Sequence, residues 1–430
     1  MKKLTSARRF ALSAVTLSLT LAFGSAQAQT TEAQLVKKLD DLAAELEKVK
    51  AELKQMKDKP APAAPAAAPL AAAAGADSAA PATQITSYGE LNFSRPRRDS
   101  SATSADVGRF VLGFQHRFDK RTKVVAELEV EHSVASSSDA GEVAVEQLYV
   151  EHKINDTYGL RGGLFLMPIG LINQSHEPTS FYGVFRPAID TAIIPTTLRE
   201  IGLQAFGEHD NGLSWSAGFS TGPDLTKWDP ADAEVVESPL GAIHQEGQLA
   251  KAKGLTVFAA ADWRGIPGLR LGGGLLAGKI GHGTAGFAAP NARYTLWDLH
   301  AKWTPGPWDL SAVYARGTIS GARELNATFS GAPYLVPKLF DGLFVQAAYK
   351  FALGGGYSVS PFARYERVNT GRKFDGVVAG ANVDAYTTEG ITTVGANFNI
   401  TPEVVIKTDY QRYKVVKDAD RFNLGLGYSF

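Results

Sequence analysis

The 430-residue sequence contains no cysteine, so neither disulfides nor thiolate-bound metals can stabilise the folded chain. Its 44 basic residues equal its 44 acidic residues, and this balance gives no electrostatic reason to expect a nucleic-acid partner. The eight histidines show no HExxH spacing, and no GxSxG nucleophile motif occurs. We therefore predict that the protein is not an enzyme and needs no metal or cofactor.

Long apolar runs are also missing beyond the amino terminus, so no membrane-spanning helix is expected there. The amino terminus itself has four cations (Lys2, Lys3, Arg8 and Arg9), a short apolar run over 11–23, and the small-residue pattern AQA at 26–28. This order is typical of a cleaved signal peptide, which we assign to residues 1–28. The chain is therefore expected to be exported, and it must then fold without disulfides.

Residues 29–59 form a second, charged segment with a heptad pattern. Its apolar positions alternate spacings of four and three: Leu35, Leu39, Leu42, Leu46, Val49, Leu53 and Met56. This a/d pattern, with Glu and Lys at the g and e positions, favours a short parallel α-helical coiled coil that joins copies of the chain. A single charged helix with i,i+4 pairs is the alternative. The Ala/Pro-rich stretch 60–84 follows as a semi-rigid linker.

From residue 85 to the end, the sequence alternates between apolar and polar residues in segments of about ten residues, the length of a tilted membrane-crossing strand. Short turns and longer polar connections separate these segments in strict alternation. The short ones are 119–121, 155–157, 209–212, 264–268, 305–307, 354–356 and 401–403. The long ones lie near 95–106, 133–141, 168–198, 222–252, 280–292, 319–339, 368–388 and 415–420. We predict an all-β fold for 85–430, a 16-stranded antiparallel transmembrane β-barrel.

The alternation also predicts which side chains meet lipid and which meet the interior. Phe110, Leu112 and Phe114 share one face of a segment, and charged residues occupy the other. The inward positions that we expect to line a water-filled pore are Arg109, Arg117, Glu127, Glu129, Lys302, Arg364, Lys407 and Asp409. Segment 142–153 has no clear assignment, because Glu146 and Tyr149 cannot share a face in a regular strand.

The chain ends on RFNLGLGYSF, in which every second residue is apolar up to Phe430. The last strand must pair with the first, because an open sheet edge in lipid leaves backbone groups without hydrogen bonds. The terminal aromatic residue resembles the signal by which the barrel-assembly machinery of Gram-negative bacteria recognises outer-membrane barrels. We therefore predict that Phe430 is an assembly signal and that the barrel lies in the outer membrane, with the coiled coil in the periplasm.

The stretch 164–202 follows the fifth strand and is long, apolar and without either periodicity in its middle. We expect its loop, 168–198, to fold into the barrel with its apolar side on the wall. Its polar groups would then form a pore constriction. These residues are His176, Glu177, Arg186, Asp190 and Arg199. The alternative is a loop used for subunit packing, with the same charges as structural pairs.

The loop carries the elements P-I-G, H-E-P, F-Y-G, R-P and I-I-P-T-T. In these elements the chain resembles proteobacterial outer-membrane porins related to the phosphate-selective porin (O/P) family. An amino-terminal coiled coil ahead of a barrel is similar to the sucrose-type and dicarboxylate-type porins. The resemblance implies a homotrimer whose third loop enters the pore, and passive diffusion of small, anionic solutes. A counterpart of the phosphate-selective arginine and lysine clusters is not found, so the sequence favours a weakly selective pore.

Two other functions remain open at this stage. A barrel can host a hydrolase, although a sixteen-stranded barrel leaves a water-filled lumen rather than a filled core. The barrel could also be a structural protein that tethers the outer membrane to peptidoglycan through the coiled coil. The partners expected for the porin are outer-membrane lipid, further copies of the chain and small hydrophilic solutes, with no nucleic acid.

Overall fold

The computed structural model describes residues 44, 47–48, 50, 82–329, 331–376 and 385–430. The signal peptide 1–28, most of the coiled coil 29–59 and most of the linker 60–84 lie outside the described residues, so these assignments stay predictions. The four described positions before residue 82 are helical, and Lys50 Nζ lies 2.9 Å from Glu47 Oε1. No helix in the described ranges is long and apolar enough to cross a membrane.

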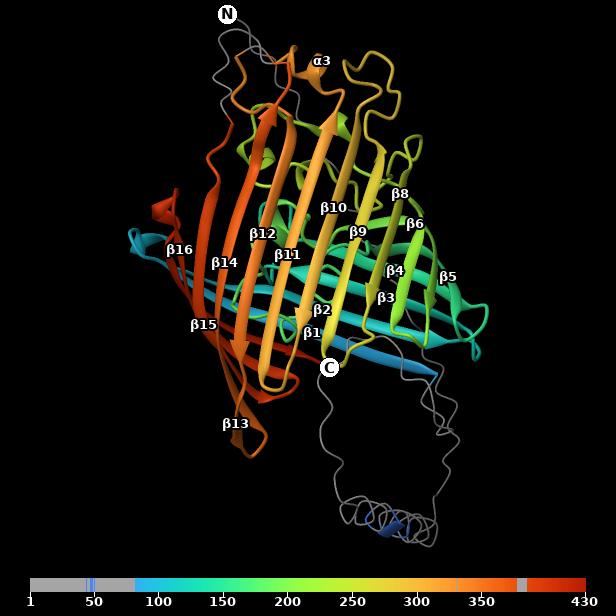
Figure 1. Cartoon of the computed structure of the whole chain (residues 1–430), viewed down its shortest axis with the longest axis vertical. Coiled ribbons are helices and arrows are strands. Elements are labelled where there is room, and N and C mark those ends of the chain that lie inside the picture. The colour runs from blue at the N-terminus through green and yellow to red at the C-terminus, as the bar shows by residue number, and fades with distance from the viewer. Residues whose placement is uncertain (1–43, 45–46, 49, 51–81, 330, 377–384) are drawn as a thin grey trace, which may run out of the picture. The chain divides into compact units, whose positions relative to one another are not determined.

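Antiparallel strands form one closed sheet (Figure 1). The strands are β1 (Thr83–Pro96), β2 (Ser104–Arg117), β3 (Thr122–Glu131), β4 (Val143–Lys153), β5 (Tyr158–Leu166), β6 (Arg199–Glu208), β7 (Leu213–Ser220), β8 (Thr256–Trp263), β9 (Leu269–Lys279), β10 (Arg293–Trp303), β11 (Trp308–Ser320), β12 (Pro337–Tyr349), β13 (Phe351–Gly354), β14 (Tyr357–Phe374), β15 (Glu389–Thr401), β16 (Val404–Tyr413) and β17 (Arg421–Ser429). Only Lys350 separates β12 from β13, and both pair with β14, so they form one interrupted strand. The wall of the barrel therefore has sixteen strands. The predicted 16-stranded barrel is confirmed.

The sheet closes where the sequence predicts, because β1 pairs with β2 on one side and with β17 on the other. The backbone of Phe430 donates to and accepts from Ser87, at 2.9 and 3.0 Å, which extends this pairing to the last residue. Every edge of the sheet is thereby satisfied, as a lipid environment requires.

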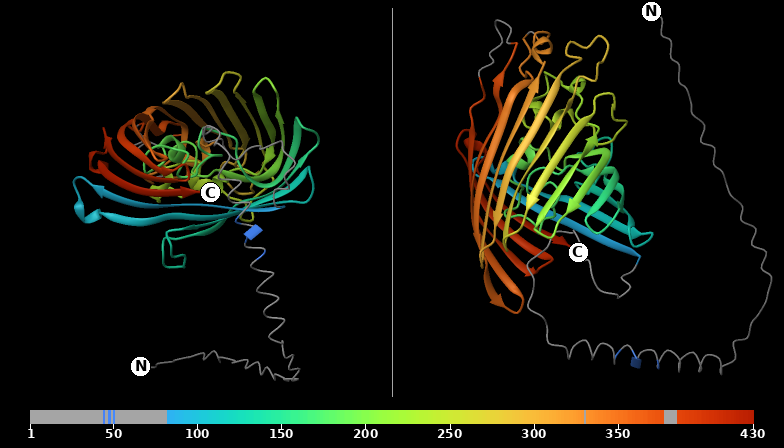
Figure 2. Two further views of the ribbon diagram at one scale, coloured as in Figure 1. Left: turned by 90° about the horizontal axis from the view of Figure 1, so that it is seen from below. Right: turned by 45° about the vertical axis from the view of Figure 1, so that its right-hand side comes forward.

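Short turns join the strands at one end of the barrel and long connections join them at the other. The long connections contain the helical turns η1 (Ser100–Ala102), α2 (Ile189–Ala192), η2 (Leu225–Lys227), η3 (Ala233–Val236), η4 (Gly241–Ile243), α3 (Arg323–Asn326) and η5 (Lys417–Ala419). Two of them, 167–198 after β5 and 221–255 after β7, run inside the ring of strands (Figure 2).

The outer face of the wall is apolar and exposed. Leu112 and Phe114 on β2 are 46% and 45% exposed, and Phe422, Leu424 and Leu426 on β17 are similarly open. A soluble protein would bury such a continuous apolar surface, whereas a transmembrane barrel presents it to hydrocarbon.

A β-bulge resolves the ambiguous segment at β4. Glu127 pairs with Gln147 and Leu128 pairs with Val145, so Glu146 is an extra residue on β4. The insertion shifts the alternation by one, and both Glu146 and Tyr149 point inward and are buried. Val145 and Leu148 on either side of the bulge remain on the exposed outer face. A regular strand could not have placed all four side chains this way.

The interior is divided into an apolar half and a polar half. The apolar half lies against β8–β12, where wall residues contact the two inward connections in one buried cluster. Its members include Met167, Ile169, Ile189, Ile193, Ile194, Leu225, Ile243, Phe258, Leu276, Leu296, Phe340 and Phe344. The polar half lies beside β1–β3 and β14–β17, and it contains the charged residues described next.

Candidate functional site: a polar cavity beside the inward-folded loop

The loop 167–198 is held in the barrel by carboxylates of the wall. The backbone amide of Gly170 donates to Asp298 Oδ1 at 3.0 Å, that of Val184 to Asp409 Oδ2 at 2.6 Å, and that of Ala188 to Glu366 Oε1 at 2.6 Å. These three acids come from β10, β16 and β14, so the loop is bound to strands far apart around the ring. These contacts place the loop inside the barrel, as the sequence predicted.

Arg364 on β14 holds the same loop from its carbonyl side. Its Nη1 donates to the Tyr182 carbonyl at 3.1 Å and its Nη2 to the Phe185 carbonyl at 3.5 Å. Its Nε donates to Glu366 at 2.8 Å, and both side chains are buried. Arg364, which we expected to line the pore, therefore lies beneath the loop together with Asp409.

A second buried cluster joins β1, β2 and β4 to the loop at His176. The Tyr88 hydroxyl donates to Glu146 at 2.6 Å and lies 2.6 Å from His176 Nε2. His176 Nδ1 lies 3.1 Å from the Asn173 carbonyl, which can only accept. These contacts hold the His176 ring between Tyr88 and the backbone of its own loop.

His176 Nε2 also lies 3.4 Å from Glu146 Oε1. Arg109 contacts the same turn of the loop, because its Nη2 donates to the His176 carbonyl at 2.6 Å, and its Nε donates to Glu90 at 2.9 Å. The bulge at Glu146 thus places a carboxylate beside the His176 ring of the loop. His176 and Arg109 anchor the loop to the wall at this point.

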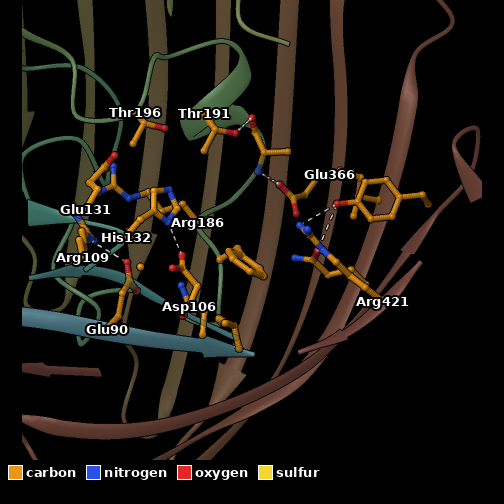
Figure 3. A pocket seen from close by; sticks show the side chains of 18 residues that line it. Glu90, Asp106, Arg109, Glu131, His132, Arg186, Thr191, Thr196, Glu366 and Arg421 are labelled. Carbon is orange, nitrogen blue, oxygen red and sulfur yellow. Dashed lines mark hydrogen bonds and ion pairs between the residues drawn. The ribbon is translucent and has the colours of Figure 1, made fainter. Parts of the chain in front are cut away.

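A polar cavity of about 380 Å³ lies between the loop and the polar half of the wall (Figure 3). It is lined by Glu90, Asn92, Asp106, Gly108, Arg109, Glu131, His132, Val184, Phe185, Arg186, Ala188, Thr191, Thr196, Glu366, Ile391, Gln411, Tyr413 and Arg421. A second cavity of about 310 Å³ shares four of these residues, namely Asn92, Asp106, Phe185 and Arg421, and reaches Pro96, Ala102 and Ala419 near the long-connection end. The shared residues place the two cavities next to each other along the inner wall.

Most charges around the cavity are paired. Glu90 binds Arg109, Glu366 binds Arg364, and Asp106 Oδ2 lies 2.8 Å from His132 Nδ1. The hydrogen bond that His132 donates to Asp106 raises the pKa of His132, which favours the charged ring.

Two guanidinium groups in the cavity wall have no carboxylate partner among the described residues. Arg186 Nη1 donates to Thr197 Oγ1 at 3.1 Å, and Arg421 Nε donates to Gln411 at 2.7 Å while its guanidinium lies 4.5 Å from the Phe185 ring centre. Figure 3 shows Arg421 across the cavity from Glu90 and Arg109. Burial lowers the pKa of Arg186 to about 10, and neighbouring Arg109 acts in the same direction, yet Arg186 remains charged at neutral pH.

Asp190 belongs to the helical turn α2 of the same loop and is only 3% exposed. Neither of its carboxylate oxygens has a hydrogen-bond partner in the described part of the chain. Burial raises the pKa of Asp190 to about 7, and the positive charge of Arg186 opposes this rise. Asp190 therefore changes its charge near neutral pH.

The remaining predicted residues lie at other places in the barrel. Arg199 Nη2 binds Glu246 of the 221–255 connection at 3.0 Å, and Lys302 Nζ binds Asp309 at 3.2 Å. Lys407 is buried under the loop, with Nζ 3.6 Å from the Phe181 ring centre. Three others, Glu127, Glu129 and Glu177, face the interior or the loop outside the cavity lining, and Arg117 is exposed at the short-turn end of β2.

Sequence reasoning missed Glu90, Arg421 and Tyr413 as cavity residues. Arg421 precedes Phe422 in the alternating terminal strand, so the same two-residue period would have placed it inward. Glu90 lies next to a bulge, where Leu91 pairs with Val107 and Gly108 is extra, so local alternation could not assign it. Within the described residues no group of three or more histidines and carboxylates could hold a metal ion.

An apolar-walled, closed sixteen-stranded barrel with an inward-folded loop and a polar cavity is a transmembrane β-barrel with the fold of the outer-membrane porins. The OmpF porin of Salmonella typhi, solved in complex with daunomycin, is similar with a TM-score of 0.56 at 13% identity, covering 81% of this chain and 97% of that one. The anion-selective porin of Comamonas acidovorans gives a TM-score of 0.49 at 11% identity, covering 81% of this chain and 100% of that one.

In sequence, the chain is 28% identical over 358 residues to an uncharacterized protein of Aquifex aeolicus, covering 80% of this chain and 79% of that protein. No protein-family model matches the chain. At 13% identity, the similarity to OmpF supports the fold alone.

Proposed function

We propose that the protein is an outer-membrane porin, a channel for passive diffusion of small hydrophilic solutes. The observation that carries the proposal is the polar cavity between the loop 167–198 and the inner wall, in a barrel whose outside is apolar. A barrel with a filled interior would bury such a loop without leaving charged groups around a cavity.

The loop is proposed to be the constriction of this channel. It crosses the interior, and its apolar side covers the wall of β8–β12, which leaves β1–β3 and β14–β17 as the walls of the solute path. Opposed charges at a constriction create a transverse field that selects by size and charge.

We further propose that the channel prefers anions. Arg186 and Arg421 face the cavity without a carboxylate partner among the described residues, whereas three of its four lining carboxylates are paired with cations. Glu131 is the lining carboxylate that forms no ion pair in the described ranges. Two unpaired guanidiniums against one unpaired carboxylate favour anionic solutes.

The experiment that tests the function is conductance across a planar bilayer. The purified protein is expected to open stepwise channels, in triplets if it is a homotrimer, and a salt gradient should give a reversal potential on the anion-selective side. A protein that folds and inserts but conducts nothing would contradict the proposal and would favour a structural tether or a barrel hydrolase.

The proposed porin assembles through its two ends. Residues 29–59 would join three copies through a periplasmic coiled coil, with contacts to peptidoglycan, and Phe430, which is 67% exposed, would be read by the barrel-assembly machinery. Export by the signal peptide 1–28 is required for this location.

A further inference from the structure

The outer face of the wall carries cations at the end with the long connections. The exposed side chains of Arg367 on β14, Arg412 on β16 and Lys414 just beyond β16 form no ion pair and no side-chain hydrogen bond within the described residues. At the opposite end of the strands, outward positions carry aromatic rings such as Trp263, Trp303 and Trp308. The two rims of the apolar band thus differ in chemistry.

The three cations lie close together on neighbouring strands. Arg367 pairs directly with Gly390 of β15, and the Lys414 amide donates to the Gly390 carbonyl at 2.9 Å from the other side. One row below, Thr392 pairs with Tyr365 on one side and Arg412 on the other. Because adjacent strands lie about 5 Å apart, Arg367 and Lys414 flank the glycine at about 10 Å, within reach of one anionic group.

Gly390 lies between these cations, beneath Tyr365 and the Lys414 side chain. A Cβ atom built there would lie 3.6 Å from the Tyr365 hydroxyl and 3.6 Å from Lys414 Cβ, so the position faces outward between them. The neighbouring carboxylate of Glu389 forms no ion pair with these cations in the described residues; its oxygens accept from the amides of Lys414, Val415 and Val416 at 2.8 to 2.9 Å. Glu389 fixes the backbone that carries Lys414.

No acidic partner for these cations is available on the lipid-facing wall of the described strands. The one outward carboxylate there, Asp341 on β12, is bound by Arg372, with Nη2 2.6 Å away. A second copy of the barrel wall could therefore not supply the missing negative charge. Arginine and lysine at the edge of an apolar membrane band attract phosphate headgroups, and guanidinium groups bind phosphate in bidentate fashion.

We propose that Arg367, Arg412 and Lys414 form a binding site for the phosphate groups of an anionic lipid in the leaflet next to the long connections. Lys279 on β9 and Arg293 on β10 repeat the arrangement at the same rim. They are directly opposite each other and unpaired in the described part of the chain, a like-charge contact that an anion would relieve. The proposal shares with the porin function only the requirement that the wall faces lipid.

The test measures lipid binding to the purified full-length protein in nonionic detergent. Binding is detected as a rise in melting temperature and as bound lipids counted in native mass spectra. Diphosphoryl lipid A is the probe. The triple variant Arg367→Gln, Arg412→Gln, Lys414→Gln is expected to bind it about tenfold or more weakly than the wild type. A matched triple variant at the short-turn end, Lys120→Gln, Arg121→Gln, Arg264→Gln, is expected to bind it like the wild type.

Equal binding by the wild type and the rim variant would overturn the proposal, as would equal stabilisation by inorganic phosphate at the same concentration. A change in oligomeric state of the rim variant without lipid would also overturn it, because the surface would then be an interface between copies. Unchanged conductance of the rim variant is expected, since these side chains lie outside the lumen. Failure of the porin function would instead appear as missing conductance of the wild type.

Discussion

The two halves of the barrel interior differ in polarity. Against β8–β12, the inward connections and the wall form a dry apolar cluster around residues such as Ile193 and Phe340, both fully buried. Beside β1–β3 and β14–β17, the same loop 167–198 presents Arg186 to a cavity lined by charged residues. One loop therefore has an apolar side that fixes its position and a polar side that faces the cavity.

The difference teaches how an inward-folded loop can be held firmly and still present polar groups. Hydrophobic burial is nondirectional and favours dense contact, so it holds the loop without using its polar groups. Directional contacts to Asp298, Glu366 and Asp409 then set the loop's backbone, and Arg186 and Arg421 line the cavity without a carboxylate partner in the described part of the chain. The following changes test this division, beginning with the largest expected effect.

Ile193→Asp should disrupt the apolar half. Ile193 is fully buried in the apolar cluster and lies close to Gly342 of the wall, so a carboxylate there would be buried without a partner. The expected cost is about 3 kcal/mol or more, with displacement of the loop and altered single-channel conductance. Thermal unfolding and conductance check this expectation.

The matched control is Thr191→Asp, since Thr191 lies on the same turn and is exposed toward the cavity. It is expected to unfold like the wild type. If Ile193→Asp unfolds and conducts like this control, the apolar half does not hold the loop.

Asp190→Asn should change how stability depends on pH. The pKa of Asp190 is raised to about 7 by burial, whereas an unfolded aspartate titrates near pH 4, so the folded chain binds more protons between these values. Stability should then fall as the pH rises through this window, by at most about 4 kcal/mol. The asparagine variant should lack this fall, measured as melting temperatures at pH 5 and pH 8.

Asp224→Asn provides a control of opposite sign. Burial alone would raise the pKa of Asp224, but hydrogen bonds from Lys251 and Thr226 outweigh it and lower the pKa. Its contribution is lost as pH falls into the acid range, so the variant should leave the difference between pH 5 and pH 8 as in the wild type. An identical pH profile for Asp190→Asn and the wild type would remove Asp190 from this role.

Arg186→Ala should shift the ion selectivity of the polar half toward cations. Removing one of two unpaired guanidiniums should lower the anion-to-cation permeability ratio by roughly twofold or more at low salt, with a smaller change at high salt because charges are screened. The measurement is the reversal potential in a salt gradient. Arg264→Ala, at a turn outside the cavity, is the control, and an unchanged potential for Arg186→Ala would place Arg186 outside the solute path.

Deletion of residues 30–59 should leave both halves of the interior unchanged. We expect single-channel conductance equal to that of the full chain, while the oligomer loses resistance to heat because the coiled coil is missing. Gel electrophoresis of samples heated in detergent checks the second effect. Equally resistant oligomers from the shortened chain would show that the barrel wall alone joins the copies.

Much of the wall could be predicted from the sequence. A two-residue alternation such as that of Phe110, Leu112 and Phe114 is local, because successive side chains of a strand point to opposite faces whatever lies beside it. Strand number, the order of short and long connections, and the closure of β17 on β1 follow from the same signal.

The candidate site was only partly predictable. Arg186 and Arg109 were expected inside the barrel and do line the cavity. The buried position of Arg364 beneath the loop, and the role of Glu146 as partner of His176, could not be predicted. Each depends on how a loop of irregular backbone lies on strands distant in sequence, and a single bulge reverses the faces of β4.

By itself, then, the amino-acid order determined a closed, apolar-coated barrel, because hydrophobic periodicity acts over a few residues and lipid permits no open edge. Only the tertiary structure decided how the interior is shared between a dry half and a charged one. The division of the interior depends on contacts such as Asp409 with Val184 and Glu90 with Arg109. These partners are distant in sequence, and strand register and loop folding bring them together.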